Sequence, residues 1–254
     1  MKKLAKKLLC LTAVLALTLS LFTGCKSKNE KTLFEYAGQE VTFQEAHVYA
    51  RIMQYQAEAQ YGAYFGDSMW SMQVGTDSKG KKITMQQSVK DSVISQLKQI
   101  KVLAAHADDY NVKLTKSEKK QIKESVDAFA KDETGKKVMK KTEADKDTIQ
   151  KLYEESTIAS KVMQAIIKML NPNDTSAAAT NKSTLLQEKQ QAAYEKVYKK
   201  WTKSADKDWD DTKSVDQDLW KEVKFKYKAT TASTTATSES TTTATTSSKT
   251  TKSK

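Results

Sequence analysis

The chain contains 254 residues, with 43 Lys and Arg against 31 Asp and Glu, which gives a formal net charge of +12. It has only seven glycines, one proline, two cysteines and two histidines. Two cysteines exclude a disulfide scaffold and a cysteine-rich zinc site. So little glycine disfavours a phosphate-binding α/β enzyme, whose turns and loops use glycine. We expect long helices joined by few tight turns.

The N-terminal segment has the pattern of an export signal. Lysines precede an uncharged apolar run from Leu8 to Phe22, which is shorter than the roughly 20 residues that span a bilayer and favours a secretory signal. The run ends in residues 21–25 (LFTGC), which resemble the lipobox of bacterial lipoproteins, where the cysteine is acylated. A plain signal peptide is the alternative. We expect a signal peptide over residues 1–24 and lipidation of Cys25.

This interpretation also predicts the location and charge of the processed chain. Residues 1–24 hold four lysines and no acid, so the charge falls from +12 to +8. Cys10 would leave with the signal, so we expect neither a free thiol nor a disulfide. Acyl chains would hold the protein at the extracytoplasmic face of the cell membrane, where a basic chain is attracted to anionic lipid head groups or wall polymers.

We expect one helical domain between two polar segments. Residues 25–31 would form a short lipidated tether and residues 32–227 the domain. Residues 228–254 are almost wholly Thr, Ser, Ala and Lys. A segment without large apolar side chains cannot offset its ordering entropy, so we expect this tail to be disordered.

Threonine caps mark the starts of three predicted helices. Thr42, with Glu45 three residues later, opens a helix whose apolar stripe is Ala46, Ala50, Met53, Ala57, Tyr61 and Tyr64. Thr84 opens a second helix, and Thr115 opens a third that ends at a break over 132–135. A fourth helix is predicted over about 147–170, before Asn171 and Pro172, and a fifth over about 185–203.

Strand patterns occur only at the two ends of this domain. Residues 32–42, interrupted by Gly38, suit a small hairpin, and the alternation of residues 222–227 (EVKFKY) is typical of a half-buried strand. Isolated strands are more stable when paired, so we expect the C-terminal segment to return and close the fold. The predicted fold class is mainly α, with a small closing β element from both ends of the domain.

The order of these elements resembles a known chaperone family. A lipobox and a short strand precede residues 41–45 (VTFQE), an aromatic loop, and helices that carry residues 96–107 (QLKQIKVLAAHA) and 152–162 (LYEESTIASKV). This order resembles the helical chaperone region of extracytoplasmic foldases, the SurA and PrsA families, and the Gram-positive lipoprotein form more closely. The likeness covers about residues 32–170 and the piece 201–225. It implies a SurA N-terminal-like fold that binds unfolded or nascent secreted proteins.

The pattern lacks one module that is common in this family. A parvulin-type prolyl isomerase domain, rich in glycine and with buried histidines, is often inserted after the helix that ends here at Leu170. Residues 171–184 are far too few for it, and His47 and His106 lie on the early helices. We therefore expect a non-enzymatic protein without a cofactor, and a residual isomerase stays as an alternative.

Residues 61–72 (YGAYFGDSMWSM) place four aromatic residues and two methionines between two helices. Met and aromatic side chains form adaptable apolar surfaces for varied partners. Two interpretations stay open, a cap on the helical core and a contact surface for unfolded proteins. The candidate client-binding residues are Tyr61, Tyr64, Phe65, Met69, Trp70 and Met72.

Other polar clusters match no catalytic or metal-binding pattern, so no metal is expected. Four aspartates have the spacing that opens a calcium loop, but Asp211 and Gln217 stand where Gly and Glu are needed, which favours a solvated turn; they are Asp206, Asp208, Asp210 and Asp211. Asp108 and Asp109 lack the marks of an acid–base pair, and both histidines suit packing or surface roles. The lysines of 136–151 alternate with acids, which favours a solvated face over nucleic-acid binding.

Two functions of different classes fit these features. The first is a membrane-anchored chaperone that binds unfolded secreted proteins through an apolar helical crevice, without its own isomerase module. The second is a structural or adaptor lipoprotein whose basic face binds an anionic wall polymer. A solute-binding lipoprotein is disfavoured because the alternating βαβ pattern is missing.

Overall fold

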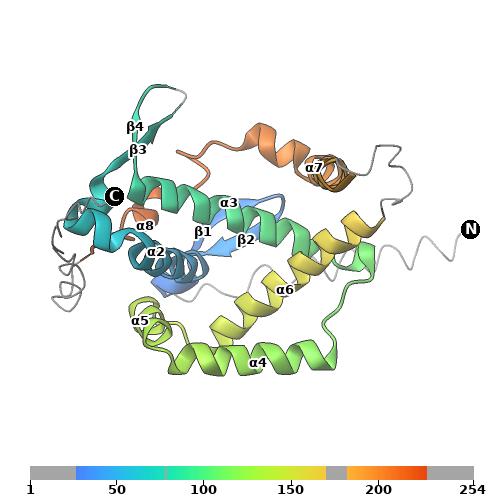
Figure 1. Ribbon diagram of the computed structural model, residues 1–254, viewed down its shortest axis with the longest axis horizontal. Coiled ribbons are helices and arrows are strands. Elements are labelled where there is room, and N and C mark those ends of the chain that lie inside the picture. The colour runs from blue at the N-terminus through green and yellow to red at the C-terminus, as the bar shows by residue number, and fades with distance from the viewer. Residues whose placement is uncertain (1–26, 78, 170–181, 228–254) are drawn as a thin grey trace, which may run out of the picture.

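The structure is a computed structural model that describes residues 27–77, 79–169 and 182–227. The expected signal peptide, Cys25 with its expected lipidation, the linker after the fourth helix and the expected tail lie outside these residues. Seven α-helices and two two-stranded antiparallel sheets form this part of the chain (Figure 1). The helices are α2 (Phe43–Phe65), α3 (Met85–Ala105), α4 (Lys116–Lys131), α5 (Glu133–Thr142), α6 (Lys146–Lys168), α7 (Lys182–Asp208) and α8 (Gln217–Trp220).

The first sheet is the predicted N-terminal hairpin. Strands β1 (Thr32–Tyr36) and β2 (Gln39–Thr42) pair antiparallel. The turn between them uses Ala37 and Gly38, both with positive φ, as a type I′ hairpin turn requires. The hairpin buries Leu33, Phe34, Tyr36 and Val41.

The predicted threonine caps are confirmed. The Thr42 hydroxyl accepts a hydrogen bond from the backbone N–H of Glu45, and the Glu45 carboxylate accepts one from the N–H of Thr42, which completes a capping box. At the start of α3, the Thr84 hydroxyl accepts a hydrogen bond from the backbone N–H of Gln87. Thr115 forms a second capping box at the start of α4. The local sequence therefore determines where these three helices begin.

The third helix ends at the predicted break, since α4 stops at Lys131, but the predicted extent of the break, 132–135, is wrong because α5 already starts at Glu133. The Asp132 carboxylate accepts hydrogen bonds from the N–H groups of Thr134 and Gly135, so it caps α5 directly after α4 ends. Gly135 is buried, and a Cβ there would collide with the backbone carbonyl of Phe129. Asp132 and Gly135 thus form a tight corner between two helices.

The prediction that strands lie only at the ends of the domain is also wrong. Strands β3 (Gln73–Thr76) and β4 (Lys82–Thr84) form a second antiparallel hairpin between α2 and α3. It projects from the body of the protein in Figure 1, and every residue of β3 is exposed. Its residues do not alternate between buried and exposed positions. The alternation of apolar and polar residues from which strands are predicted is therefore missing.

The buried residues form three clusters, and α2 contributes to more than one of them. The first joins the N-terminal hairpin, α2, α3, the short 3₁₀ segment η2 (Gly66–Ser71) and the C-terminal residues 215–225. The second joins the opposite side of α2 to α4, α5 and the start of α6. The third packs α3 and α6 against α7.

The C-terminal segment does return to the N-terminal hairpin, but not as the predicted strand. Val215 forms a single β-bridge with Phe34, and the Asp216 N–H donates to the Leu33 carbonyl at 2.8 Å. The residues predicted as a strand, 222–227, form no strand. The N–H of Phe225 bonds instead to a side-chain oxygen on α3.

No helix in the described ranges combines the length and the apolar character needed to cross a membrane.

Candidate functional site

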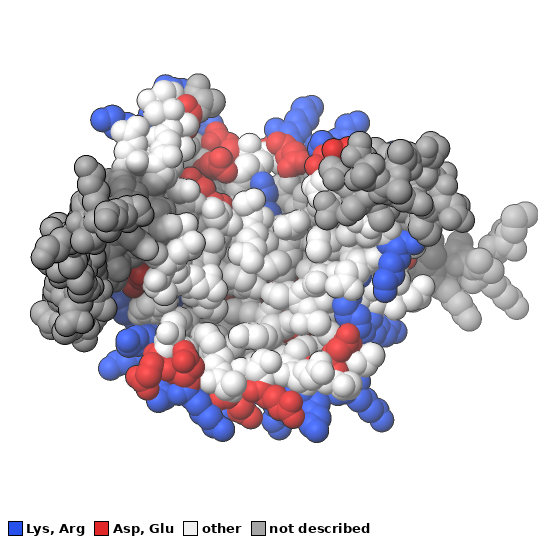
Figure 2. All heavy atoms as spheres, in the orientation of Figure 1, with Lys and Arg blue, Asp and Glu red and all other residues white. Residues whose placement is uncertain are grey.

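One face of the molecule is largely uncharged and hollowed. In Figure 2 its centre is formed by uncharged residues, while Lys, Asp and Glu gather along its edges, including the edge made by α4. The hollow lies between α2 and α6 and has a volume of about 190 Å³. It is lined by Val48, Tyr49, Ile52, Ile149, Leu152, Tyr153 and Ser156.

Helical spacing brings these side chains together. Val48 and Ile52 are four residues apart on α2. On α6, Leu152 and Tyr153 lie three and four residues after Ile149, so each group shares one helix face. The sequence-based stripe on α2 did not include Val48 or Ile52. Their spacing of four was the available signal, and it shows that α2 is apolar on two sides.

The mouth of the hollow carries one polar contact. The Tyr49 hydroxyl lies 2.6 Å from the Ser156 hydroxyl and links α2 to α6. Burial raises the pKa of Tyr49, so the phenol stays neutral at physiological pH. The hollow therefore offers an uncharged lining in which the hydroxyls of Tyr49 and Ser156 are paired with each other.

A half-buried ion cluster joins α2 and α6, which line the hollow, to α3. Lys101 on α3 lies 2.8 Å from Glu45 on α2 and 3.0 Å from Glu155 on α6. Burial lowers the pKa of Lys101, but the two carboxylates outweigh burial and raise it, so the lysine is fully charged at neutral pH. Removing one member would leave a half-buried charge with fewer partners, so the cluster favours this relative position of the three helices.

The size of the hollow limits what it can bind. It is smaller than the roughly 300–1,000 Å³ typical of small-molecule sites. A dry apolar cavity of about 150 Å³ can hold a benzene ring. The hollow thus fits one apolar side chain of a larger partner better than a cofactor or metabolite.

The six predicted client-binding residues divide into two groups. Tyr61, Tyr64 and Phe65 are 36%, 82% and 41% exposed on the last turns of α2. Met69 and Trp70 are 0% and 5% exposed in the first cluster, which agrees with the core interpretation for these two, and Met72 is half-buried. Only the exposed group, which we call the aromatic ridge (Tyr61, Tyr64 and Phe65), is placed to contact a partner.

The histidines pack against other side chains. Burial, together with Arg51, lowers the pKa of His47 to about 4, and its Nε2 accepts from the Arg51 guanidinium at 3.0 Å. His106 stacks on Trp201 with ring centres 3.8 Å apart, and its Nδ1 lies 2.6 Å from Asp109. These contacts match the packing roles expected for both.

The aspartates considered for calcium are used separately. Asp206 accepts from the hydroxyls of Tyr36 and Thr202, Asp210 holds a turn through the N–H of Thr212, and Asp211 accepts from the indole of Trp209. Within the described residues, no group of three or more His, Cys, Asp or Glu side chains could hold a metal ion.

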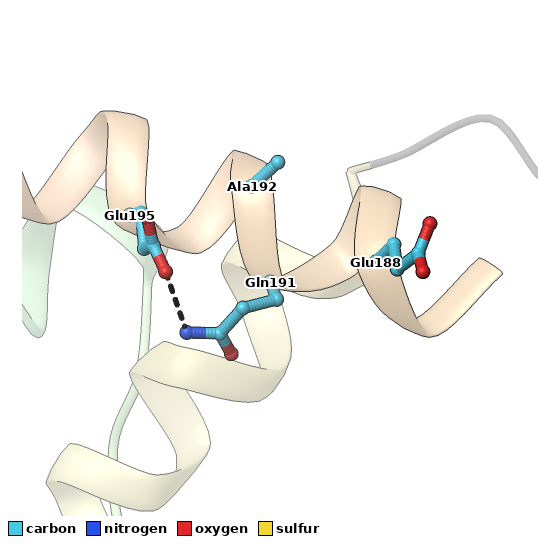
Figure 3. A pocket seen from close by; sticks show the side chains of 4 residues that line it. All are labelled: Glu188, Gln191, Ala192 and Glu195. Atoms are coloured by element: carbon cyan, nitrogen blue, oxygen red, sulfur yellow. Dashed lines mark hydrogen bonds between the residues drawn. The ribbon is translucent and has the colours of Figure 1, made fainter. Parts of the chain in front are cut away.

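A second depression lies on α7, shown close up in Figure 3. Its volume is about 470 Å³, and its lining residues are Glu188, Gln191, Ala192 and Glu195. All four are exposed on one helix, and the Gln191 amide donates to the Glu195 carboxylate at 3.0 Å. An open surface of this kind provides no enclosed site for a ligand.

Comparisons with known proteins give no match: no protein-family model, no curated protein and no solved structure is similar to this chain.

Proposed function

We propose that this protein is a lipid-anchored extracytoplasmic chaperone that holds unfolded secreted proteins on its uncharged face. The observation that carries the proposal is the hollow between α2 and α6, whose lining carries no charged residue. Figure 2 shows a largely uncharged face with charged residues along its upper and lower edges. The lining of the hollow is mainly apolar and aromatic, as in sites that bind apolar groups. The order of the sequence elements, which resembles the SurA and PrsA chaperone regions, supports the same function.

The geometry suits weak and general binding. The hollow accepts one apolar side chain, and the aromatic ridge supplies a second apolar contact with its rings exposed. Unfolded chains expose apolar side chains at irregular intervals, so separate small contacts bind many sequences better than one large pocket does. The charged residues along the edges keep the free chaperone soluble, and the lysines among them attract acidic segments of a client.

The proposal is tested by the aggregation of a chemically denatured protein. Citrate synthase unfolded in guanidinium is diluted into buffer with residues 26–254, and light scattering is followed. We expect suppression at near-stoichiometric chaperone. The variants Ile52→Ser with Tyr153→Ser, and Tyr64→Ser with Phe65→Ser, should each weaken suppression roughly tenfold, since each removes two apolar contacts.

The matched control is Val74→Ser on β3. Val74 is 44% exposed, similar to Phe65, but lies outside the hollow and the ridge, so its variant should suppress aggregation as well as the unsubstituted protein. Unchanged scattering with the unsubstituted protein would reject the chaperone function. Salt-sensitive binding to purified wall polymer without any effect on scattering would favour the adaptor function instead.

A further inference from the structure

The C-terminal residues 223–227, here called the strap, form no helix or strand and contact both α2 and α3. Val223 and Phe225 are buried and Tyr227 is half-buried, whereas Lys224 and Lys226 are exposed. The strap therefore points alternate side chains inward, as a bound strand does. Yet it pairs with no strand.

Side chains of the two helices bind the backbone of the strap. Arg51 on α2 donates to the Lys224 carbonyl at 2.9 Å. On α3, Lys90 donates to the Val223 carbonyl at 3.3 Å, and the Gln86 side chain accepts from the Phe225 N–H at 2.8 Å. Contacts to carbonyl and N–H groups do not depend on the side chains of the bound segment, so they suit more than one sequence.

Arg51 is held in place by other residues of α2, independently of the strap. The Arg51 guanidinium donates to the Gln54 side chain at 2.7 Å and to His47 at 3.0 Å, and Gln54 donates to Glu58 at 2.7 Å. All four residues lie on α2. The backbone-binding group is therefore positioned by its own helix, as a preorganised binding site requires.

The inward side chains of the strap pack against residues of α2 and η2. The Phe225 ring packs edge-on against Trp70, with centres 4.7 Å apart, and the Arg51 guanidinium lies 5.8 Å from the Phe225 ring centre, within cation–π range. Tyr227 lies against Gly62, where a Cβ would come within 2.6 Å of its ring. The absence of a side chain at Gly62 thus makes room for an aromatic ring.

Two buried cations contact the C-terminal segment, and closing an apolar core would not require them. Arg51 and Lys90 are 8% and 6% exposed, and burying charge is costly. Both donate to backbone carbonyls of the C-terminal segment, Lys90 also to that of Trp220. Apolar side chains would close a core at lower cost, so these residues indicate a groove built to bind peptide backbone.

We propose that the groove between α2 and α3 is a binding site for extended peptides with apolar side chains at alternate positions, and that the strap is its resident occupant. Backbone contacts with alternating side-chain pockets are a recurrent mode of peptide recognition. A tethered occupant acts at an effective concentration of the order of millimolar. An incoming segment therefore binds by displacing the strap, at a site separate from the hollow.

The first test uses the full, unsubstituted chain. Amide hydrogen exchange at Phe225 is compared with exchange at Val93 and Leu97, which are fully buried on α3. A displaceable strap opens locally, so the Phe225 amide should exchange at least about tenfold faster than both. Exchange at the same rate as Val93 and Leu97 would mean that the strap leaves only on global unfolding, and would overturn the proposal.

The second test measures peptide binding in trans. A fluorescent peptide with the sequence of residues 221–228 (KEVKFKYK) is added to the full chain carrying Val223→Ser and Phe225→Ser, which weakens the resident strap. The peptide should bind roughly tenfold more tightly than to the unsubstituted chain. Adding Arg51→Met should remove that gain, because the Lys224 carbonyl of the peptide loses its donor.

The matched control is Lys224→Ser with Lys226→Ser, which alters the exposed side chains and keeps the inward ones. This variant should bind the peptide no better than the unsubstituted chain does. A folded Val223→Ser, Phe225→Ser variant that fails to bind the peptide would overturn the proposal. A dimer of the unsubstituted chain that exchanges straps would also overturn it, because the occupant would then be a second copy of the chain. If the Val223→Ser, Phe225→Ser variant does not fold, the hydrogen-exchange measurement at Phe225 decides.

Discussion

Helix α2 has two apolar sides, and the described residues cover them to different degrees: the strap closes one side, whereas α4, α5 and α6 leave part of the other open. On the covered side, Arg51 and Gln54 interrupt the apolar stripe and are buried beneath the strap. On the partly open side, Val48 is fully buried against α4, α5 and α6 and Ile52 is half-buried, and both line the hollow between α2 and α6. The difference shows that polar residues inside an apolar stripe can mark the side occupied by backbone, whose polar groups need partners. A purely apolar side can stay partly open.

The largest effect should come from the covered side. Phe225→Ala removes a buried ring that packs on Trp70, and we expect the free energy of unfolding to fall by about 3–5 kcal/mol. Urea unfolding followed by tryptophan fluorescence measures this. Lys226→Ala, one residue away and exposed, should change it by less than about 0.5 kcal/mol. A loss at Phe225 below that of the lysine variant would show that the covered side is not part of the core.

The corner between α4 and α5 should be the next most sensitive region. Gly135→Ala places a methyl group against the Phe129 carbonyl where α5 meets α4, and we expect a loss of about 3 kcal/mol, the upper end for overpacking. Gly75→Ala is the control, since nothing lies within 4 Å of a Cβ at that glycine. Thermal unfolding of both variants tests this, and equal melting temperatures would contradict the tight corner.

The Gly135 corner also shows where sequence analysis stops. The caps at Thr42, Thr84 and Thr115 could be predicted because the hydrogen bonds that start a helix are local. Asp132 caps a helix in the same way, but a glycine three residues later was interpreted as a break. That glycine is required by contact with α4, a tertiary constraint that local rules do not contain.

The strap shows the same limit for the candidate site. The alternation of residues 222–227 correctly predicts which side chains point inward, since Val223 and Phe225 are buried. It does not predict that side chains of Arg51 and Gln86, more than 130 residues away in the chain, replace a partner strand. The hollow likewise depends on α2 meeting α6, and only the spacing of Val48 and Ile52 could be noticed beforehand.

On the covered side, Lys90 should also make the free energy of unfolding depend on pH, with a smaller effect. Burial lowers the pKa of Lys90 from 10.5 to about 8. Below pH 8 the lysine is charged in both states, and the native state bears the full cost of the buried charge. Between pH 8 and 10.5 the unfolded state binds more protons, so this residue makes stability rise with pH, by roughly 2 kcal/mol from pH 8 to 10.

Comparison with Lys90→Met isolates this effect. The difference in unfolding free energy between the two proteins should change by that amount between pH 8 and 10, and should stay constant between pH 6 and 7. The scan ends at pH 10 because burial raises the pKa of Tyr36 to about 12, so ionisation of this tyrosine in the unfolded state lowers stability above that pH. Parallel curves for the two proteins from pH 8 to 10 would contradict the buried, charged state of Lys90.

The smallest effect should come from the partly open side. Tyr49→Phe removes the hydrogen bond to Ser156, and we expect a loss of about 1 kcal/mol. Ser156→Ala should cost the same, and the double variant no more than either single one, because both remove one interaction. Additive losses in urea unfolding would show that the two hydroxyls act separately. Since this pair contributes little to folding and its loss makes the hollow more apolar, suppression of aggregation should be preserved in Tyr49→Phe, whereas Ile52→Ser with Tyr153→Ser loses it.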